Sequence, residues 1–391
     1  MKRPLGSCAV ALALLAGSAA VGSPAVAAHE TVAAAQAPAP RAAIAAGRAV
    51  SGLGLVATGA VRATPTHPRP ARPVPPRRVQ WQAPVRNVFA PQSIWRVPVA
   101  KARLDPHSAA MVGQLTHQVA EYYGGTAALN VWQYNVSFVS VPRTQPRVDM
   151  RWDNCQKKDY TPAGLTGPGG VLTGVPIPAR AHAAAGTDGE LTLYAAATDQ
   201  LWEFWQAKKD AAGHWSACWG GRIDHASTSR GWFDNGFGAS ASGLAIAGGM
   251  LSLADVHRGH VDHALSLAIP DPAPWDHVSW PAQRSDGSPA SKSLIAEGTR
   301  FRLSAKVDLR RLHLTPIALM IARAAQRYGF VVTDMSGCVA VSAESGTNVK
   351  AATGHNPWVA ALGGVPDYLQ LKDFPWASLQ ALPKDWGHRG R

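Results

Sequence analysis

The central part of the sequence combines tryptophans with acidic and histidine side chains, a mixture that suits the chemistry of sugars. Flat indole faces stack on the apolar face of a pyranose ring, while carboxylates bind hydroxyl groups or transfer protons. The candidate proton-transfer residues are Asp188, Glu203, Asp224, His225, Asp262 and His263. The candidate sugar-binding residues are Trp202, Trp205, Trp219, Trp232 and Arg222.

This set of residues is compatible with two enzyme classes. Glycoside hydrolysis needs two carboxylates that flank the scissile bond. A polysaccharide lyase instead needs a base and a cation that neutralises the uronate, for which the candidates are His225, His263, Tyr194, Arg222 and Arg230. A structural interpretation stays open, in which Trp205 and Trp219 belong to the core and Glu203 is an ordinary strand residue.

Residues 260–269 alternate in a way that predicts a strand with one apolar face. The opposite face would carry small and polar side chains, among them Asp262, Ala264 and Ser266. Such a face leaves room for a substrate groove or for a packed helix or loop. Asp262 and His263 would point to opposite faces unless a bulge intervenes.

A metal site is suggested by His257, His260 and His263, which recur every three residues. We expect Gly259 to end the local element between the first two of them, so no metal site is predicted. Residues 231–249 are rich in Gly, Ser and Ala but lack the Gly-Lys-Ser/Thr ending of a phosphate-binding loop. No cofactor is therefore predicted, and this stretch is expected to pass close to other backbone segments.

The elements that must position these residues are mostly short strands joined by turns of Gly, Pro, Asp and Asn. The predicted strands are 131–141, 147–152, 190–197, 201–206, 215–219, 260–269, 301–307, 329–333 and 338–343. Helices are predicted at 106–123 and 315–328, the second with Thr315 as N-cap and Pro316 at its first position. This order predicts a mainly β fold, a β-sandwich or jelly roll with two or three packed helices.

The chain is predicted to have three segments. Residues 1–28 are typical of a signal peptide, with Lys2 and Arg3 before an apolar stretch and small residues at the end. Residues 29–80 are rich in Ala, Pro and Arg and predict a disordered linker. All 14 tryptophans lie in residues 81–391, which are expected to form the folded domain. We therefore predict a secreted protein, extracellular or periplasmic, with no integral membrane segment.

The formal net charge of +13 does not predict a nucleic-acid partner, because most of it falls before residue 80. The basic linker is expected either to contact anionic surfaces or to act as a solubilising tail. Removal of the leader with Cys8 leaves three cysteines, and an exported protein is free to form disulfides. We predict a Cys155–Cys218 disulfide, because both residues lie in polar surroundings near tryptophans, and a buried free thiol at Cys338.

Several ordered motifs resemble a mostly uncharacterised family of secreted bacterial proteins. The matching motifs are 92–95, 201–204, 261–265 and 325–329, the last followed by Asp334, within a resemblance that covers most of residues 87–343. The resemblance implies a fold similar to the jelly rolls of polysaccharide-active enzymes, but it transfers no assigned chemistry.

Together, these features favour a secreted carbohydrate-active enzyme that cleaves an extracellular or cell-wall polysaccharide, as a glycoside hydrolase or a polysaccharide lyase. The alternative is a noncatalytic secreted protein that binds a glycan or the cell envelope through the same tryptophans. A third interpretation is a secreted structural or partner-binding protein with a basic tail.

Overall fold

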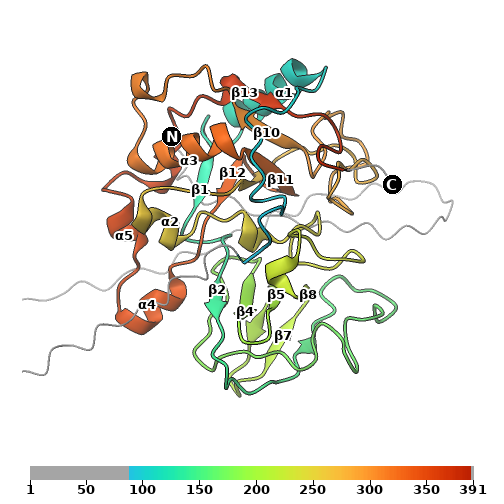
Figure 1. Cartoon of the computed structure of the whole chain (residues 1–391). Helices are drawn as coiled ribbons and strands as arrows, with labels where there is room; N and C mark the ends of the chain where they lie inside the picture. Colours follow the sequence, from blue (N-terminus) through green and yellow to red (C-terminus); the bar gives the residue numbers. More distant parts are fainter. Residues whose placement is uncertain (1–87, 389–391) are drawn as a thin grey trace, which may run out of the picture. The chain divides into compact units, whose positions relative to one another are not determined.

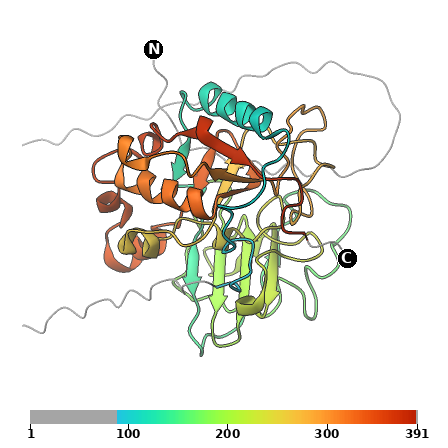
Figure 2. The ribbon, with the colours of Figure 1, turned by 45° about the horizontal axis from the view of Figure 1, so that its top comes forward.

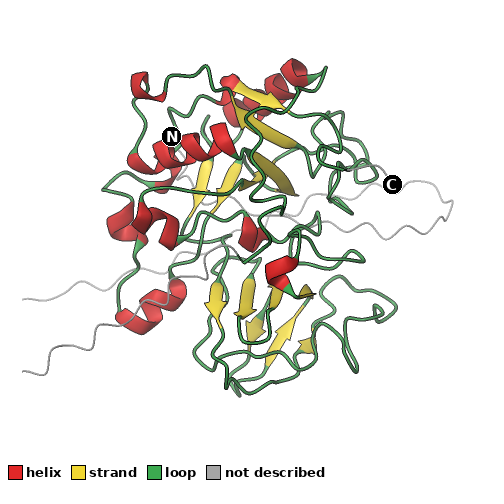
Figure 3. Cartoon of the chain, viewed as in Figure 1, coloured by secondary structure: helices red, strands yellow, loops and turns green. Residues whose placement is uncertain are grey.

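The computed structural model describes residues 88–388, which belong to one compact unit. The predicted signal peptide and linker, residues 1–28 and 29–80, lie outside the described residues. The regular structure consists of many short strands and few helices, and long loops join them (Figure 3). The prediction of a mainly β fold is confirmed.

The largest sheet has six strands of mixed direction, in the order β1-β12-β9-β11-β10-β13 (Figure 1). Its strands are β1 (Ala128–Asn130), β9 (Leu265–Ile269), β10 (Arg300–Leu303), β11 (Phe330–Met335), β12 (Ala340–Ser342) and β13 (Leu379–Ala381). The pairs β1–β12 and β9–β11 are parallel, and the others are antiparallel.

Two smaller sheets carry the tryptophan-rich part of the chain. One has the order β2-β4-β5-β8, with β2 (Phe138–Ser140), β4 (Leu191–Ala195), β5 (Gln200–Trp205) and β8 (Trp219–Asp224). The other has the order β3-β7-β6, with β3 (Arg151–Trp152), β6 (Lys208–Lys209) and β7 (Trp215–Ala217). The jelly-roll form of the fold prediction is not confirmed, because the sheets are mixed and are not closed.

Five α-helices accompany these sheets in residues 88–388: α1 (Ser108–Glu121), α2 (Leu253–Arg258), α3 (Pro316–Arg327), α4 (Thr347–Thr353) and α5 (Trp358–Ala361). The two long helices were predicted, and Thr315 caps α3 by accepting a hydrogen bond from the Ala318 N–H at 3.1 Å. In Figure 2, α1 lies against β13 and α3 against β10. Within this part of the chain no helix has the length and apolar character needed to cross a bilayer.

Cys155 and Cys218 form the disulfide that the sequence predicts, with a Cα–Cα distance of 5.5 Å. Such a disulfide fits an extracellular protein. The prediction of a free thiol at Cys338 is wrong, because none of the described cysteines is free.

The strand predicted at 260–269 begins only at Leu265. Helix α2 precedes it, with a capping box between Ser252 and Asp255, and Gly259 ends the helix in a left-handed conformation. The residues between Gly259 and Leu265 therefore do not alternate, and the assignment of Asp262 and His263 to opposite strand faces is wrong. The small face of β9 is not an open groove, because Ser266 and Ala268 are buried, and the Ser266 N–H donates to the Gly249 carbonyl beside the strand at 2.8 Å.

Residues 231–249, the glycine-rich loop, pass close to other backbone as predicted. A Cβ atom at Gly249 would lie 2.8 Å from the backbone nitrogen of Ser266 and 2.3 Å from the Trp95 ring. A side chain at this position would therefore push the loop away from the six-stranded sheet.

Candidate functional site

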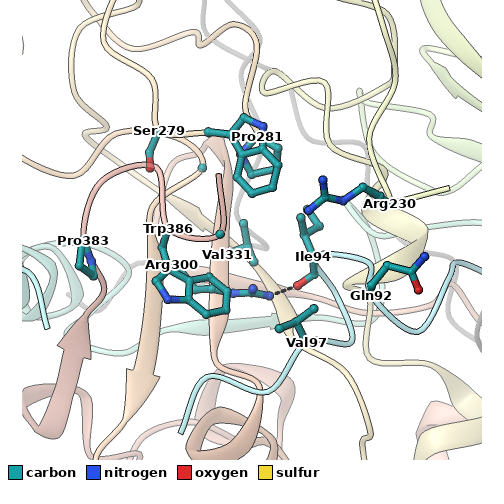
Figure 4. A pocket seen from close by; sticks show the side chains of 13 residues that line it. Gln92, Ile94, Val97, Arg230, Ser279, Pro281, Arg300, Val331, Pro383 and Trp386 are labelled. Atoms are coloured by element: carbon teal, nitrogen blue, oxygen red, sulfur yellow. Dashed lines mark hydrogen bonds between the residues drawn. The ribbon is translucent and has the colours of Figure 1, made fainter. Parts of the chain in front are cut away.

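A cavity of about 450 Å³ lies where the segment after residue 91, the edge of the six-stranded sheet and the C-terminal segment meet. Its most prominent side chains are two arginines and two tryptophans: Arg230, Trp280, Arg300 and Trp386. We call this cavity the Arg–Trp pocket. Figure 4 shows Arg230 and Arg300 reaching toward it from different sides. A volume of this size is typical of small-ligand sites.

Arg300 is placed by strand β10, where it pairs with Val331 of β11. Phe301, its neighbour, points into the apolar core, so alternation sends Arg300 to the other face of the sheet. Only 6 % of Arg300 is exposed. One Nη atom donates to the carbonyl of Ile94, while Nε has no hydrogen-bond partner among the described residues. Burial lowers the pKa of Arg300 to about 9.

Indole rings contact both guanidinium groups of the Arg–Trp pocket. The Trp386 ring lies 5.2 Å from the Arg300 guanidinium carbon. Arg230 lies beside the edge-to-face pair of Trp232 and Trp280, at 5.3 and 5.2 Å from their ring centroids. These cation–π contacts hold the two guanidinium groups at the pocket.

Acidic side chains do not line the Arg–Trp pocket in the described structure. The nearest ones along the chain are engaged elsewhere: Asp385 accepts from the Trp280 N–H at 2.6 Å, and Glu297 is fully buried beside Asp286. None of the carboxylates that the structure describes forms an ion pair with Arg230 or Arg300. The charged part of the lining is therefore purely cationic.

A second group of charged residues lies inside the molecule, and all of its members are less than 9 % exposed. We call it the buried acid cluster: Asp188, Glu190, Glu203, Asp286, Glu297 and Asp334. Electrostatic coupling links Glu203 to Glu190, Glu190 to Asp188, Asp188 to Asp334, and Asp334 to Asp286. Residues far apart in the sequence thus form one chain of interacting acids.

Protonation lowers the free-energy cost of burying these acids, because a neutral carboxyl group loses less hydration than a carboxylate. Burial raises the pKa of Glu203 to about 8, and burial together with Glu203 raises the pKa of Glu190 well above its ordinary value. Burial raises the pKa of Asp286, and burial together with the neighbouring Asp286 carboxylate raises the pKa of Glu297 well above its ordinary value. The cation in this group is Arg284, which interacts with three of the acids.

The buried acid cluster also fastens the glycine-rich loop. Glu203 accepts hydrogen bonds from the N–H groups of Ile246 and Ala247, at 3.2 and 2.8 Å. Asp334 accepts from the Ala241 N–H at 2.5 Å. Arg284 donates to two carbonyls of the same loop, at 3.1 and 2.7 Å. The cluster therefore fixes the loop that carries Trp232 next to the Arg–Trp pocket.

A small cavity of about 40 Å³ touches the buried acid cluster at Asp188, Glu190 and Asp334. Trp205 and Asn135 also line it, and both amide atoms of Asn135 lack hydrogen-bond partners in the described structure. This volume holds one or a few water molecules but no sugar ring.

Asp262 and His263 belong to a separate ion-pair network at α2. His263 Nε2 lies 3.2 Å from the Asp255 carboxylate, and its Nδ1 lies 2.8 Å from the Ala264 carbonyl oxygen. Both ring nitrogens face acceptors, so this geometry selects the doubly protonated imidazolium. Burial opposes that charge, but the Asp255 contact outweighs it and raises the pKa of His263. Arg258 bridges Asp255 and Asp262, at 2.6 and 3.4 Å.

The remaining predicted residues are dispersed. Asp224 and His225 are exposed at the end of β8, where Arg222 pairs with Asp224 at 3.2 Å. Trp202 is fully buried in the core, and Trp205 and Trp219 are 9 % exposed. His257, His260 and His263 do not form a metal site, and in residues 88–388 no three His, Cys, Asp or Glu side chains are placed to hold a metal ion. Of the predicted residues, Arg230 lines the Arg–Trp pocket and Trp232 lies beside it.

The sequence pattern missed most residues of both regions. Arg300, Trp280 and Trp386 come from separate segments that only tertiary packing brings together. Glu190 and Asp334 lie at strand ends, where acids are ordinarily solvated. A signal was present in the run of apolar residues before Asp334, which predicts a buried strand end.

No family model, curated protein or solved structure matches this chain. The resemblance to secreted bacterial proteins therefore stays a prediction.

Proposed function

We propose that this protein binds a glycan in the Arg–Trp pocket as a noncatalytic, secreted glycan-binding protein. The observation that carries this proposal is a cavity of about 450 Å³ bordered by the indoles of Trp280 and Trp386. Indole faces stack on sugar rings, and a few polar groups then fix the orientation of the ligand.

The chemistry of the lining favours binding over cleavage. Hydrolysis needs two carboxylates, and elimination needs a base near the uronate. The described lining of the pocket offers neither a carboxylate nor a histidine or tyrosine. Of the two functions expected from the sequence, glycan binding therefore fits this site better.

Secretion remains part of the proposal. The Cys155–Cys218 disulfide is compatible with an oxidising compartment. The basic linker at 29–80 would then tether the domain to an anionic surface outside the cell.

Glycoside hydrolysis is the second candidate, and one observation favours it. Asp188, Glu190 and Asp334 border a common small cavity, and burial raises the pKa of Glu190 and Asp334 well above the ordinary values. A carboxylic acid that stays protonated at neutral pH is what a general acid requires. The cavity would have to open before a sugar could reach these groups.

The test is a binding screen of the purified protein against neutral and acidic polysaccharides, followed by calorimetry with the oligosaccharides that bind. We expect Trp386→Ala and Trp280→Ala to weaken binding about tenfold or more, since each removes a stacking surface. Trp275→Ala is the matched control, because Trp275 is 51 % exposed and lies outside the pocket.

Release of reducing ends and absorbance of unsaturated uronates are followed in the same samples. Binding without either signal supports the noncatalytic function. Reducing ends that disappear in Asp188→Asn would favour the hydrolase. Failure of every glycan to bind would overturn the proposal.

A further inference from the structure

We infer that the Arg–Trp pocket recognises an oxyanion, and that Arg300 is the residue that binds it. This inference rests on the proposed function, because it names the class of glycan: a sugar that carries a carboxylate or a sulfate. An oxyanion is also the chemistry shared by free sulfate and phosphate, which the experiment below separates from sugars.

The first observation is the unbalanced charge of Arg300. Only 6 % of Arg300 is exposed, yet no described carboxylate pairs with its guanidinium group. Its Nε atom also lacks a hydrogen-bond partner in the described region. Burying an unpaired charge is costly, and Arg300 borders a cavity in which an anion could pair with it.

A purely structural role explains only part of the geometry. The contact with the Ile94 carbonyl ties the segment after residue 91 to the sheet, and the Trp386 ring covers the guanidinium. Both contacts would be made equally well by a group with fewer donors. They leave Nε unused, and a planar fork of N–H groups matches the two oxygens of a carboxylate or sulfate.

The second observation is that the charged side chains lining the Arg–Trp pocket are all positive. Arg230 contacts both Trp232 and Trp280 and adds a second cation. The described lining contains no acid that would neutralise either arginine. Two cations in a concave site attract an anion, and the adjacent indoles select one that is attached to a ring.

Arg302 provides a matched comparison on the same strand and the same sheet face. Its guanidinium donates to Gln380 at 2.9 Å and to the carbonyls of Val99 and Ala100 at 2.8 and 2.6 Å. Arg302 is therefore satisfied by the protein and lies outside the pocket, whereas Arg300 two residues earlier is not satisfied.

The experiment is isothermal titration of the full chain with four probes at constant ionic strength: trigalacturonate, neutral trigalactose, sulfated trigalactose and sodium sulfate. We expect the acidic sugars to bind about tenfold or more tightly than trigalactose, and Arg300→Met to remove that difference. Arg302→Met should keep it within about twofold. If Arg300→Met does not fold, Arg230→Met and Arg300→Lys are titrated instead. Each of these variants should reduce the preference for acidic sugars over trigalactose without removing it.

Each outcome is decisive for one of the two proposals. Preference for trigalacturonate or for the sulfated sugar supports the inference and identifies the anion. Equal binding of trigalactose and the acidic sugars overturns the inference and leaves the proposed function standing. Binding of sulfate alone, lost in Arg300→Met, supports the oxyanion site and overturns the proposed function.

Discussion

The Arg–Trp pocket and the buried acid cluster both bury charged groups, and they compensate for it in different ways. The acids are fixed by backbone N–H groups, by one another and by Arg284, around a cavity of about 40 Å³. Arg300 keeps an unused donor beside a cavity of about 450 Å³. Buried atoms without a described partner occur in both regions, among them Arg284 Nε and the two Glu297 carboxylate oxygens. The regions therefore differ in the space beside them: the first borders room for water only, whereas the second borders a cavity of small-ligand size.

This difference separates support from recognition. Raised pKa values are often taken as a mark of an active site, but structural networks raise them too. In this protein the acids hold the glycine-rich loop, and that loop carries Trp232 to Arg230 at the pocket. We therefore interpret the acids as structural residues that support the binding site. The following substitutions test this separation of support from recognition.

Arg284→Met should have the largest effect on stability. The substitution removes the cation that interacts with Asp286, Glu297 and Asp334, and it leaves two loop carbonyls without a donor. We expect a loss of about 3–5 kcal/mol in the free energy of unfolding, measured in urea at pH 7. Arg310→Met, which alters an exposed ion pair with Asp308, is the control and should change the free energy of unfolding far less. Equal stability of the two variants would contradict a role for Arg284 in charge compensation.

Glu203→Gln should change the pH dependence of stability. Because the pKa of folded Glu203 is raised to about 8, the folded state keeps a proton that the unfolded chain releases above its ordinary pKa. The contribution of Glu203 to the free energy of unfolding is therefore greatest at low pH. As the pH rises, this contribution falls by about 1 kcal/mol per pH unit until the pH passes about 8.

The variant should start less stable at pH 5, since one loop N–H loses its acceptor, and then fall less steeply than the wild type. Chemical unfolding at half-unit steps from pH 5 to 9 measures both slopes. Parallel curves for the two proteins would show that Glu203 does not hold the proton. Glu121→Gln, at an exposed position, serves as the control.

His263→Asn should have a smaller effect with the same sign. The raised pKa of His263 means that its ion pair with Asp255 is fully present below about pH 6.5 and is lost as pH rises through the higher folded value. We expect the variant to lose about 1–3 kcal/mol at pH 6 and less at pH 9. An equal deficit at both pH values would indicate a loss of packing alone, and His260→Asn is the exposed control.

Asp224→Asn should have the smallest effect. The Asp224 side chain is 47 % exposed and pairs with Arg222 at the end of β8, away from both cavities. We expect a change in unfolding free energy below about 1 kcal/mol and unchanged glycan binding. A tenfold loss of glycan binding or cleavage would show that Asp224, a predicted catalytic residue, belongs to the functional site.

Local sequence signals predicted local structure well. Thr315 and Pro316 mark the start of α3, and the predicted strands 190–197 and 201–206 form the antiparallel pair β4 and β5. The same approach failed after Gly259, where alternating residues are held in place by the side-chain pair of His263 and Asp255 rather than by a strand. The capping box of Ser252 and Asp255 was a local signal for α2 that the strand pattern obscured.

The candidate site depended on long-range packing and was predictable only in part. Asp188 and Glu203, two of the predicted catalytic residues, lie in the buried acid cluster, but their partners Glu190 and Asp334 become neighbours only in the folded chain. Arg300 and Trp386 are separated by most of the C-terminal quarter of the chain, and no spacing rule relates them. Arg230 and Trp232 join the predicted residues to the Arg–Trp pocket.

The division between recognition and support is tested most directly by titrating trigalacturonate into Arg300→Met and Asp188→Asn side by side, in the same buffer. We expect Arg300→Met to weaken binding about tenfold or more and Asp188→Asn to leave it within about twofold. Loss of binding in Asp188→Asn, with binding retained in Arg300→Met, would contradict this assignment and move the functional site to the buried acid cluster.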